Sequence, residues 1–224
     1  MRVLTWNLFH GRAVPNAGRD LQVEFAAALA SWDWDVALLQ EVPPWWPPAL
    51  ARACDAQQCS VLTSRNALPA LRRALALRAP DVIKSNGGGC NAILVRASGR
   101  GPAITGHRRV LLRRWPERRV CHGVLLSGGA WVANLHAQVH SPQRAQADID
   151  RAAAATRSWA GDAPTLLGGD FNVRKPAAPG FAHLGGHGVD HILGCGLVAA
   201  GGVELPDRGY LSDHAPVLLA VQAR

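Results

Sequence analysis

Side chains that suit a phosphate group and a hard cation recur at the ends of apolar runs along this chain. The clearest case is Gly169-Asp170-Phe171-Asn172, which follows the apolar residues 164–168. A carboxylate there can hold water or a metal ion, and the neighbouring amide can donate to a phosphate oxygen. The pattern returns in Trp6-Asn7, Gln40-Glu41, Asn134-Leu135-His136 and Ser212-Asp213-His214. Although Asp and Asn after glycines are also ordinary turn residues, five such strand ends indicate one chemical site.

Strands and helices that would position these residues follow from the apolar patterning. Strands are predicted from the first residues onward and at residues 36–42, 91–96, 119–126, 131–137, 164–169, 189–193 and 215–221. Helices are predicted at residues 19–31, 45–57, 66–78 and 142–159, and residues 176–188 are predicted to form a long loop. Ser141 and Pro142 are typical of a helix N-cap and first helical position. Because strands come in pairs with helices between them, the pattern favours two sheets covered by helices.

The composition predicts one globular domain, residues 1–224. The chain is 48% hydrophobic, and none of its apolar runs approaches the ~20 residues of a membrane span. Five cysteines without CxxC spacing favour free thiols in a reducing compartment, although Cys54 and Cys59 could close a short loop in an oxidising one. We therefore expect a cytoplasmic monomer, or a secreted one if a signal peptide has been removed.

The positive charge of the chain is concentrated in one segment. The formal net charge is +8, and six arginines fall within twelve residues: Arg108, Arg109, Arg113, Arg114, Arg118 and Arg119. Such a cluster attracts polyanions, either nucleic acid or acidic lipid head groups. A general bias toward arginine with solvated side chains explains it equally well. Charge alone therefore does not choose the partner.

Seven short motifs, taken in order, resemble those of the endonuclease/exonuclease/phosphatase family. They are Thr5-Trp6-Asn7, Leu39-Gln40-Glu41, Asn91-Ala92-Ile93-Leu94, Asn134-Leu135-His136, Gly169-Asp170-Phe171-Asn172, Val189-Asp190-His191-Ile192-Leu193 and Ser212-Asp213-His214-Ala215-Pro216. This superfamily of metal-dependent phosphoesterases contains pancreatic-type deoxyribonucleases, AP endonucleases, neutral sphingomyelinases and inositol polyphosphate 5-phosphatases. The resemblance extends from residue 3 to residue 221. It implies an α/β fold, a four-layer α/β/β/α sandwich of two mixed sheets flanked by helices, which agrees with the patterning.

The resemblance also implies a Mg²⁺ site, with Mn²⁺ as the alternative cation. Glu41 would be the principal carboxylate ligand, with Asn7 and Asp213 close by. Mg²⁺ keeps several waters, so one or two carboxylates suffice. Asp170 would orient or deprotonate the attacking water, and Asn172 would hold a phosphate oxygen.

Two histidines and an arginine complete the site that the resemblance implies. His214 would act at the scissile phosphate with its ring fixed by Asp190, and His136 resembles the second histidine of the deoxyribonuclease branch. Arg119 resembles the substrate-facing arginine of the family, since a planar guanidinium suits phosphate. Asn7 and Asn91 would add polar contacts to the substrate. The remaining histidines, His10 among them, are predicted to be structural or at the surface, and most tryptophans to be packed.

The branch of the family stays open because the chain departs from the known patterns. Its single tyrosine, Tyr210, does not occupy the mid-chain place that the AP-endonuclease branch uses. A glutamate partner for His136 is missing near residues 86–91, where Gly87-Gly88-Gly89 stands instead. The short stretch between Asn172 and Asp190 leaves little room for inserted recognition loops.

Three hypotheses for the function follow. The leading one is a Mg²⁺-dependent phosphodiesterase acting as an endo- or exonuclease on nucleic acid, with DNA favoured. The second is a lipid or inositol-phosphate phosphoesterase, for which Trp45-Trp46 would face a membrane; the lack of an obvious basic amphipathic helix speaks against it. The third is a polyanion-binding scaffold without activity, against which every expected site residue type is present.

Overall fold

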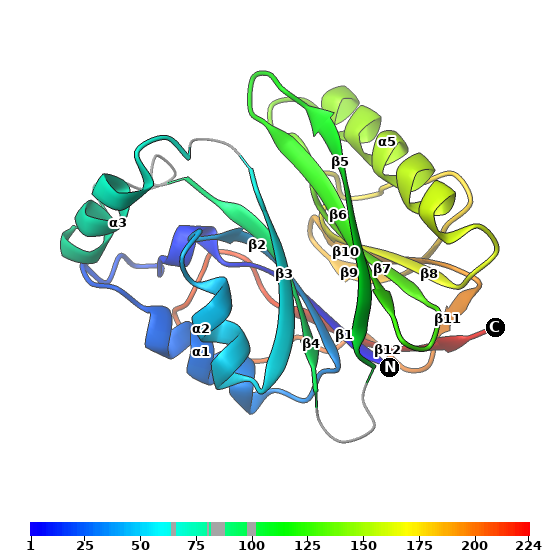
Figure 1. Cartoon of the computed structure of the whole chain (residues 1–224), viewed down its shortest axis with the longest axis horizontal. Helices are drawn as coiled ribbons and strands as arrows, with labels where there is room; N and C mark the ends of the chain where they lie inside the picture. Colours follow the sequence, from blue (N-terminus) through cyan, green and yellow to red (C-terminus); the bar gives the residue numbers. More distant parts are fainter. Residues whose placement is uncertain (64–65, 80, 82–87, 98–101) are drawn as a thin grey trace.

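A computed structural model of the chain describes residues 1–63, 66–79, 81, 88–97 and 102–224. Within these residues, two mixed six-stranded sheets pack face to face (Figure 1), in the strand orders β11-β12-β1-β2-β4-β3 and β5-β6-β7-β8-β10-β9. The first sheet contains β1 (Arg2–Asn7), β2 (Val36–Val42), β3 (Ala56–Leu62), β4 (Cys90–Arg96), β11 (Leu197–Ala199) and β12 (Val217–Ala223). The second contains β5 (Ile104–Arg113), β6 (Arg119–Leu126), β7 (Trp131–His136), β8 (Thr165–Asp170), β9 (Ala182–His187) and β10 (Asp190–Cys195).

Helices cover the outer faces of both sheets. The short turn η1 (Phe9–Gly11) follows β1, and the helices are α1 (Gln22–Ser31), α2 (Pro47–Ala53), α3 (Pro69–Arg78) and α5 (Pro142–Ala160). Figure 1 shows α1 and α2 beside the first sheet and α5 lying along the second. The predicted four-layer sandwich is therefore confirmed. In the described parts of the chain, no helix has the length and apolar character needed to cross a membrane.

The elements that the sequence did not predict lie at sheet edges. The helix predicted over 45–57 ends at Ala53, and β3 begins at Ala56. Strand β9 occupies part of the predicted loop 176–188, and β5 contains several of the clustered arginines. Each of these strands is the last of its sheet, so on one side no other strand of the described chain pairs with it. Exposed edge strands carry polar residues and glycines instead of an apolar run, and their patterning is therefore weak.

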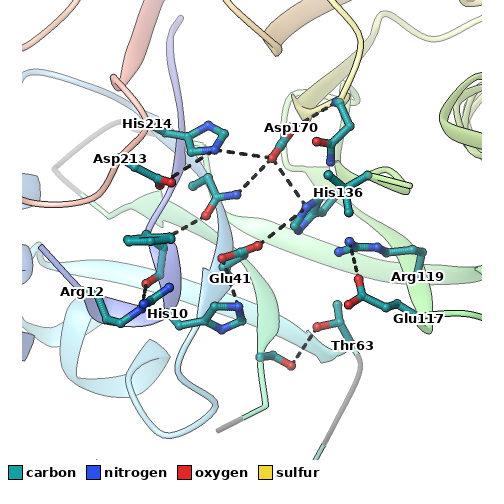
Figure 2. A pocket seen from close by; sticks show the side chains of 15 residues that line it. His10, Arg12, Glu41, Thr63, Glu117, Arg119, His136, Asp170, Asp213 and His214 are labelled. Atoms are coloured by element: carbon teal, nitrogen blue, oxygen red, sulfur yellow. Dashed lines mark hydrogen bonds and ion pairs between the residues drawn. The ribbon is translucent and has the colours of Figure 1, made fainter. Parts of the chain in front are cut away.

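The interior strands bring the predicted site residues to one edge of the sandwich. Strands β1 and β2 are parallel, as are β7 and β8, so their carboxyl ends open in the same direction within each pair. The register of β7, β8 and β10 sets Asp170 beside both His136 and Asp190. Side chains from these strand ends and from the loop before β12 face a common pocket (Figure 2). The patterning alone predicted the strand ends, and the pairing explains why they meet.

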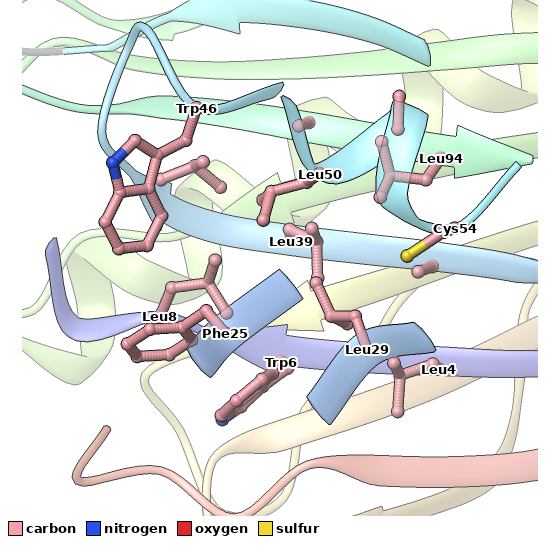
Figure 3. Close-up of a cluster of buried hydrophobic side chains, with 14 of the residues drawn as sticks. Leu4, Trp6, Leu8, Phe25, Leu29, Leu39, Trp46, Leu50, Cys54 and Leu94 are labelled. Carbon is pink, nitrogen blue, oxygen red and sulfur yellow. The ribbon is translucent and has the colours of Figure 1, made fainter. Parts of the chain in front are cut away.

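Three apolar clusters hold the layers together. One lies between α1, α2 and the first sheet and includes Trp6, Phe25 and Leu50 (Figure 3). Another fills the space between the sheets, and a third lies under α5 around Ile149. Alternate residues of β1 face different clusters, with Trp6 outward and Val3 between the sheets, as the two-residue period of a strand requires. All five cysteines are free thiols, so Cys54 and Cys59 are not bridged.

A glycine is required at position 169, near the end of β8 and next to Asp170, which lines the pocket. The φ of Gly169 is 141°, and an added Cβ would collide with the backbone carbonyl of Leu135 in β7. We therefore expect Gly169→Ala to lower the free energy of unfolding by about 3 kcal/mol or more. The control is Gly128→Ala, because a Cβ on Gly128 meets no atom of the described chain within 4 Å. Urea denaturation of both variants checks this, and equal midpoints would contradict it.

Candidate active site

A polar cavity of about 320 Å³ lies at this edge of the sandwich (Figure 2). Its lining includes most of the predicted site residues: Asn7, Glu41, Arg119, His136, Asp170, Asn172, Asp213 and His214. Asp190 lies directly behind it, bonded to His214. Residues that are 163 positions apart, such as Asn7 and Asp170, are hydrogen-bonded here. The fold thus assembles in one place what the sequence carries at separate strand ends.

Asp170 is the centre of the polar network. Its Oδ2 accepts a hydrogen bond from Asn7 Nδ2 at 3.0 Å, and its Oδ1 accepts one from the backbone N–H of Asn172 at 2.9 Å. The same Oδ2 lies 3.5 Å from His136 Nε2 and 4.0 Å from His214 Nε2. Burial, and then the charge of Asp190, raise the pKa of Asp170 to about 7. This carboxyl group can therefore gain or lose a proton near neutral pH.

His214 and Asp190 form a close ion pair. The distance from His214 Nδ1 to Asp190 Oδ2 is 2.7 Å, and Asp190 Oδ1 is buried without a hydrogen-bond partner in the described structure. Burial lowers the pKa of His214, but the hydrogen bond and charge of Asp190 outweigh it and raise this pKa to about 9. His214 therefore carries a positive charge at neutral pH.

His136 has the opposite character to His214. Burial, followed by the charges of Arg119 and His214, lowers the pKa of His136 well below its usual value. The ring is 4% exposed and neutral, so it can take part in hydrogen bonding without adding charge. One cavity thus contains a neutral and a charged histidine on either side of Asp170.

Backbone strain is concentrated at this cavity. Glu41, Asn172 and Ser212 have φ values of 50°, 51° and 60°, which residues with side chains seldom adopt. The Ser212 hydroxyl donates to the backbone oxygen of Asn7 at 2.7 Å and accepts from the His214 N–H at 3.0 Å. These bonds hold the His214 loop against β1. Strain of this kind is typical of functional sites.

The oxygen atoms on one wall of the cavity fit a hard divalent cation. Glu41 and Asp213 both interact with the charge of Arg12, and the Glu41 carboxylate lies 3.0 Å from His10 Nε2. Asn7 Oδ1 accepts from the Phe9 N–H at 2.9 Å and keeps a second lone pair. Two carboxylates and an amide oxygen in a polar cavity with room for water are the environment that Mg²⁺ prefers.

A second group of metal-binding atoms also lies here. Ligand atoms of Asp170, Asp190 and His214 come within 4.8 Å of one another. However, His214 is protonated and its Nδ1 is already paired with Asp190, so its ring is a poor ligand for a hard cation. The wall formed by Glu41, Asn7 and Asp213 is therefore the better match to the predicted cation.

Some predicted residues are placed away from the cavity. Asn91 is fully buried, and its Nδ2 donates to the Val120 carbonyl at 3.1 Å, so it joins the two sheets instead of contacting substrate. Gln40 and Asn134 also join the sheets, through an amide hydrogen bond of 2.8 Å. The lipid hypothesis would require Trp45 and Trp46 to face a membrane, but Trp46 is 2% exposed and Trp45 packs against the core.

Several cavity residues were not predicted. His10, expected to be structural or at the surface, pairs with Glu41, and Arg12 lies 3.7 Å from the centre of the Phe9 ring. Both follow Asn7 within five residues, so their nearness to a predicted strand end was the available signal. Glu117 lines the cavity and binds Arg119, which follows it two positions later in the sequence.

Comparisons with known proteins agree with this geometry. Among curated proteins, no sequence matches the chain. A functionally unknown conserved protein from Enterococcus faecalis V583 aligns with TM-score 0.73 and 17% identity over 100% of both chains. An endonuclease/exonuclease/phosphatase from Beutenbergia cavernae DSM 12333 aligns with TM-score 0.71 and 20% identity over 100% of this chain and 71% of that one. A mannosyl-6-phosphatase from Bacteroides thetaiotaomicron VPI-5482 aligns with TM-score 0.72 and 14% identity over 99% of each chain.

These structural likenesses concern the fold, since all three identities are low. The sequence comparison is more specific. The sequence pattern of the Endonuclease/Exonuclease/phosphatase family matches residues 4–214, which include every predicted site residue. With the sandwich fold and the polar cavity in place, this match shows that the chain belongs to the Endonuclease/Exonuclease/phosphatase family.

Proposed function

We propose that this chain hydrolyses phosphodiester bonds of nucleic acid with the help of Mg²⁺. Family membership supports hydrolysis of phosphoesters. The observation that carries the proposal is the position of Asp170, which lies between His136 and His214 in the cavity that Glu41 also lines. A carboxylate that titrates near pH 7 beside a positively charged imidazole can remove a proton from water and stabilise an anion.

Each residue of the cavity has its own role in the proposed hydrolysis. Asp170 Oδ2 accepts the proton of the attacking water, while Asn7 and the Asn172 backbone hold its carboxylate in place. His214 points its Nε2–H at a phosphate oxygen because Asp190 holds its Nδ1. Mg²⁺ bound by Glu41, Asn7 and Asp213 would neutralise charge at the phosphate and lower the pKa of water.

The loop that precedes Arg119 supports a nucleic-acid substrate, since Glu117 of this loop and Arg119 line the cavity. Residues 114–118 connect β5 to β6, and within this loop Arg114 and Arg118 are exposed and Trp115 is 80% exposed. Exposed tryptophan between arginines suits stacking on a base beside the phosphate backbone. Arg118 also donates to the Leu62 carbonyl at 2.7 Å, which fixes it beside β3. Arg113 is held by Asp148 of α5 at 3.1 Å and is not expected to contact substrate.

A lipid phosphoester is the second candidate, because α3 is a basic helix with exposed leucines. The described side chains of α3 include none that is buried. Leu71 and Leu75 are 56% and 46% exposed, and Arg72 and Arg73 lie on the same helix. Against this candidate, the Trp45-Trp46 pair that would have faced the membrane is packed.

Trp115→Ala distinguishes stacking from general charge attraction. We expect the KM for a short oligonucleotide to rise about tenfold, since stacking on an aromatic ring contributes ~1–3 kcal/mol per base. The value of kcat should change little, because the stack forms in the ground and transition states alike. An abasic oligonucleotide of the same length, which keeps the phosphates but has no bases, is the control substrate. An equal rise in KM for both substrates would argue against stacking.

A panel of substrates tests the proposed function. Plasmid DNA, single-stranded RNA, an abasic duplex, sphingomyelin and a phosphoinositide are each incubated with the protein, with and without Mg²⁺. The proposal predicts the highest kcat/KM on a nucleic acid and only with Mg²⁺. Turnover confined to the two lipids would contradict it and favour the second candidate.

A further inference from the structure

Glu117 binds the arginine of the cavity wall (Figure 2). Glu117 Oε2 lies 2.7 Å from Arg119 Nη2, and the two side chains are 18% and 8% exposed. Both line the same cavity as Asp170 and His136. The Nε of Arg119 is buried and has no hydrogen-bond partner among the described residues. The guanidinium thus lies at the cavity wall with Glu117 bonded to it, so the charge of Glu117 stands next to any phosphate that approaches Arg119.

The charge of Glu117 matters for any phosphate that approaches Arg119. The negative charge of Glu117 opposes the attraction between Arg119 and an anion, so an anion gains less from the positive charge of Arg119 than it would beside an uncharged residue. A phosphodiester carries one negative charge, whereas a phosphomonoester carries close to two above its second pKa of ~6. Repulsion by a nearby carboxylate therefore penalises the monoester about twice as much.

Other carboxylates of the cavity do not have the same effect. Glu41 and Asp213 belong to the wall that fits a divalent cation, which would offset their charge. Asp190 is offset by His214, and Asp170 lies between His136 and His214. Glu117 instead offsets the arginine that is suited to bind phosphate, and so it reduces the positive charge available to the substrate.

We propose that Glu117 is a specificity-determining residue that makes the site favour phosphodiesters over phosphomonoesters. The inference rests on the proposed phosphodiester hydrolysis and adds the charge of the preferred substrate. The fold itself does not decide this point, since a mannosyl-6-phosphatase has a similar structure. The ion pair at Arg119 supplies a local reason.

The test compares two esters with the same leaving group. p-Nitrophenyl phosphate is the monoester, and the p-nitrophenyl ester of thymidine 5′-monophosphate is the diester. In Glu117→Gln, we expect the ratio of kcat/KM for the monoester to that for the diester to rise about tenfold over wild type. Glu117→Asp keeps the charge and should stay near the wild-type ratio.

A matched surface variant controls for loss of a Glu–Arg pair in general. Glu204 binds Arg2 with 3.1 Å between Oε2 and Nη2, outside the cavity. Glu204→Gln should leave the ratio unchanged. Circular dichroism and thermal midpoints establish that the variants are folded. An unchanged ratio in Glu117→Gln, or an equal rise in Glu117→Asp, would overturn the inference.

Binding without turnover separates this inference from the proposed function. Calorimetry with Mg²⁺ present measures the affinity for inorganic phosphate and for dimethyl phosphate at pH 8. Glu117→Gln should strengthen inorganic phosphate binding about tenfold more than dimethyl phosphate binding. Equal changes would reject the role of Glu117 even if the wild type cleaves diesters. If the wild type cleaves neither ester, the proposed function fails, and these affinities still decide the role of Glu117.

Discussion

Glu41→Ala is expected to abolish Mg²⁺-stimulated turnover while the protein remains folded. The Glu41 side chain is 22% exposed on the cavity wall, and its described polar contacts are with His10 and His136, so little packing is lost. Loss of the main carboxylate ligand removes several kcal/mol of stabilisation from the developing charge, which corresponds to a fall in kcat of at least about 10³-fold. Steady-state kinetics on the best nucleic-acid substrate measure this.

Metal binding provides a second measurement for the same variant. Calorimetry should show a large loss of Mg²⁺ affinity in Glu41→Ala, and thermal unfolding should lose its stabilisation by Mg²⁺. Glu24→Ala is the control, because Glu24 is in α1, outside the cavity, and pairs with Arg19. Full activity of Glu41→Ala, or unchanged Mg²⁺ affinity, would remove Glu41 from the proposed metal site.

His214→Ala is expected to lower kcat by more than the ~10²–10⁴-fold that is typical of losing an acid–base group, because a charge at the phosphate is lost as well. His214 is protonated at neutral pH and lies 4.0 Å from Asp170, so it can stabilise the anion that forms when water attacks. The effect should appear in kcat more than in KM, since this charge acts mainly in the transition state.

Asp190→Asn is the partner variant in this comparison. The asparagine keeps the shape next to His214 Nδ1 but removes the charge that raises the pKa of the ring. We expect a smaller loss of kcat than in His214→Ala, with the loss increasing as the pH is raised. A fully active Asp190→Asn beside an inactive His214→Ala would show that the ion pair is not needed.

The interior of the fold could be predicted from the sequence because its strands are buried on both faces. Strand β2, predicted at 36–42, begins and ends at Val36 and Val42, and β6 agrees equally well with residues 119–126. Helix α5 begins after Ser141, whose hydroxyl accepts the Arg144 N–H at 3.1 Å, as its N-cap pattern indicated. In these elements, local pattern and burial require the same structure.

The edge strands were harder to predict because their residues contact solvent as well as neighbouring residues. Strand β5 pairs with β6 along its length, yet Arg108 and Arg109 are exposed and hide the strand pattern. In β9, Gly185 and Gly186 sit where larger side chains would collide with neighbouring groups, which local propensity does not indicate. Long-range packing decides both cases.

The candidate site likewise contains residues that could be predicted from the sequence and residues that could not. Residues at strand ends, such as Asp170 and Glu41, were predicted and line the cavity. His10 was missed because its partner Glu41 is 31 positions away and only the fold brings them together. Asn91 was misplaced because a polar residue at the start of a strand can face either a cavity or the opposite sheet. Its hydrogen bond to the Val120 carbonyl shows that it faces the opposite sheet.

Cleavage of a short labelled oligonucleotide by the wild-type protein tests the central claim most directly. The protein is first stripped with a chelator, and the rate of phosphodiester cleavage is then followed as Mg²⁺ is added back. The account predicts background rates in chelator, full recovery with excess Mg²⁺, and saturation at one affinity that matches calorimetry. Cleavage that continues unchanged in chelator, or no cleavage at any Mg²⁺ concentration, would contradict it.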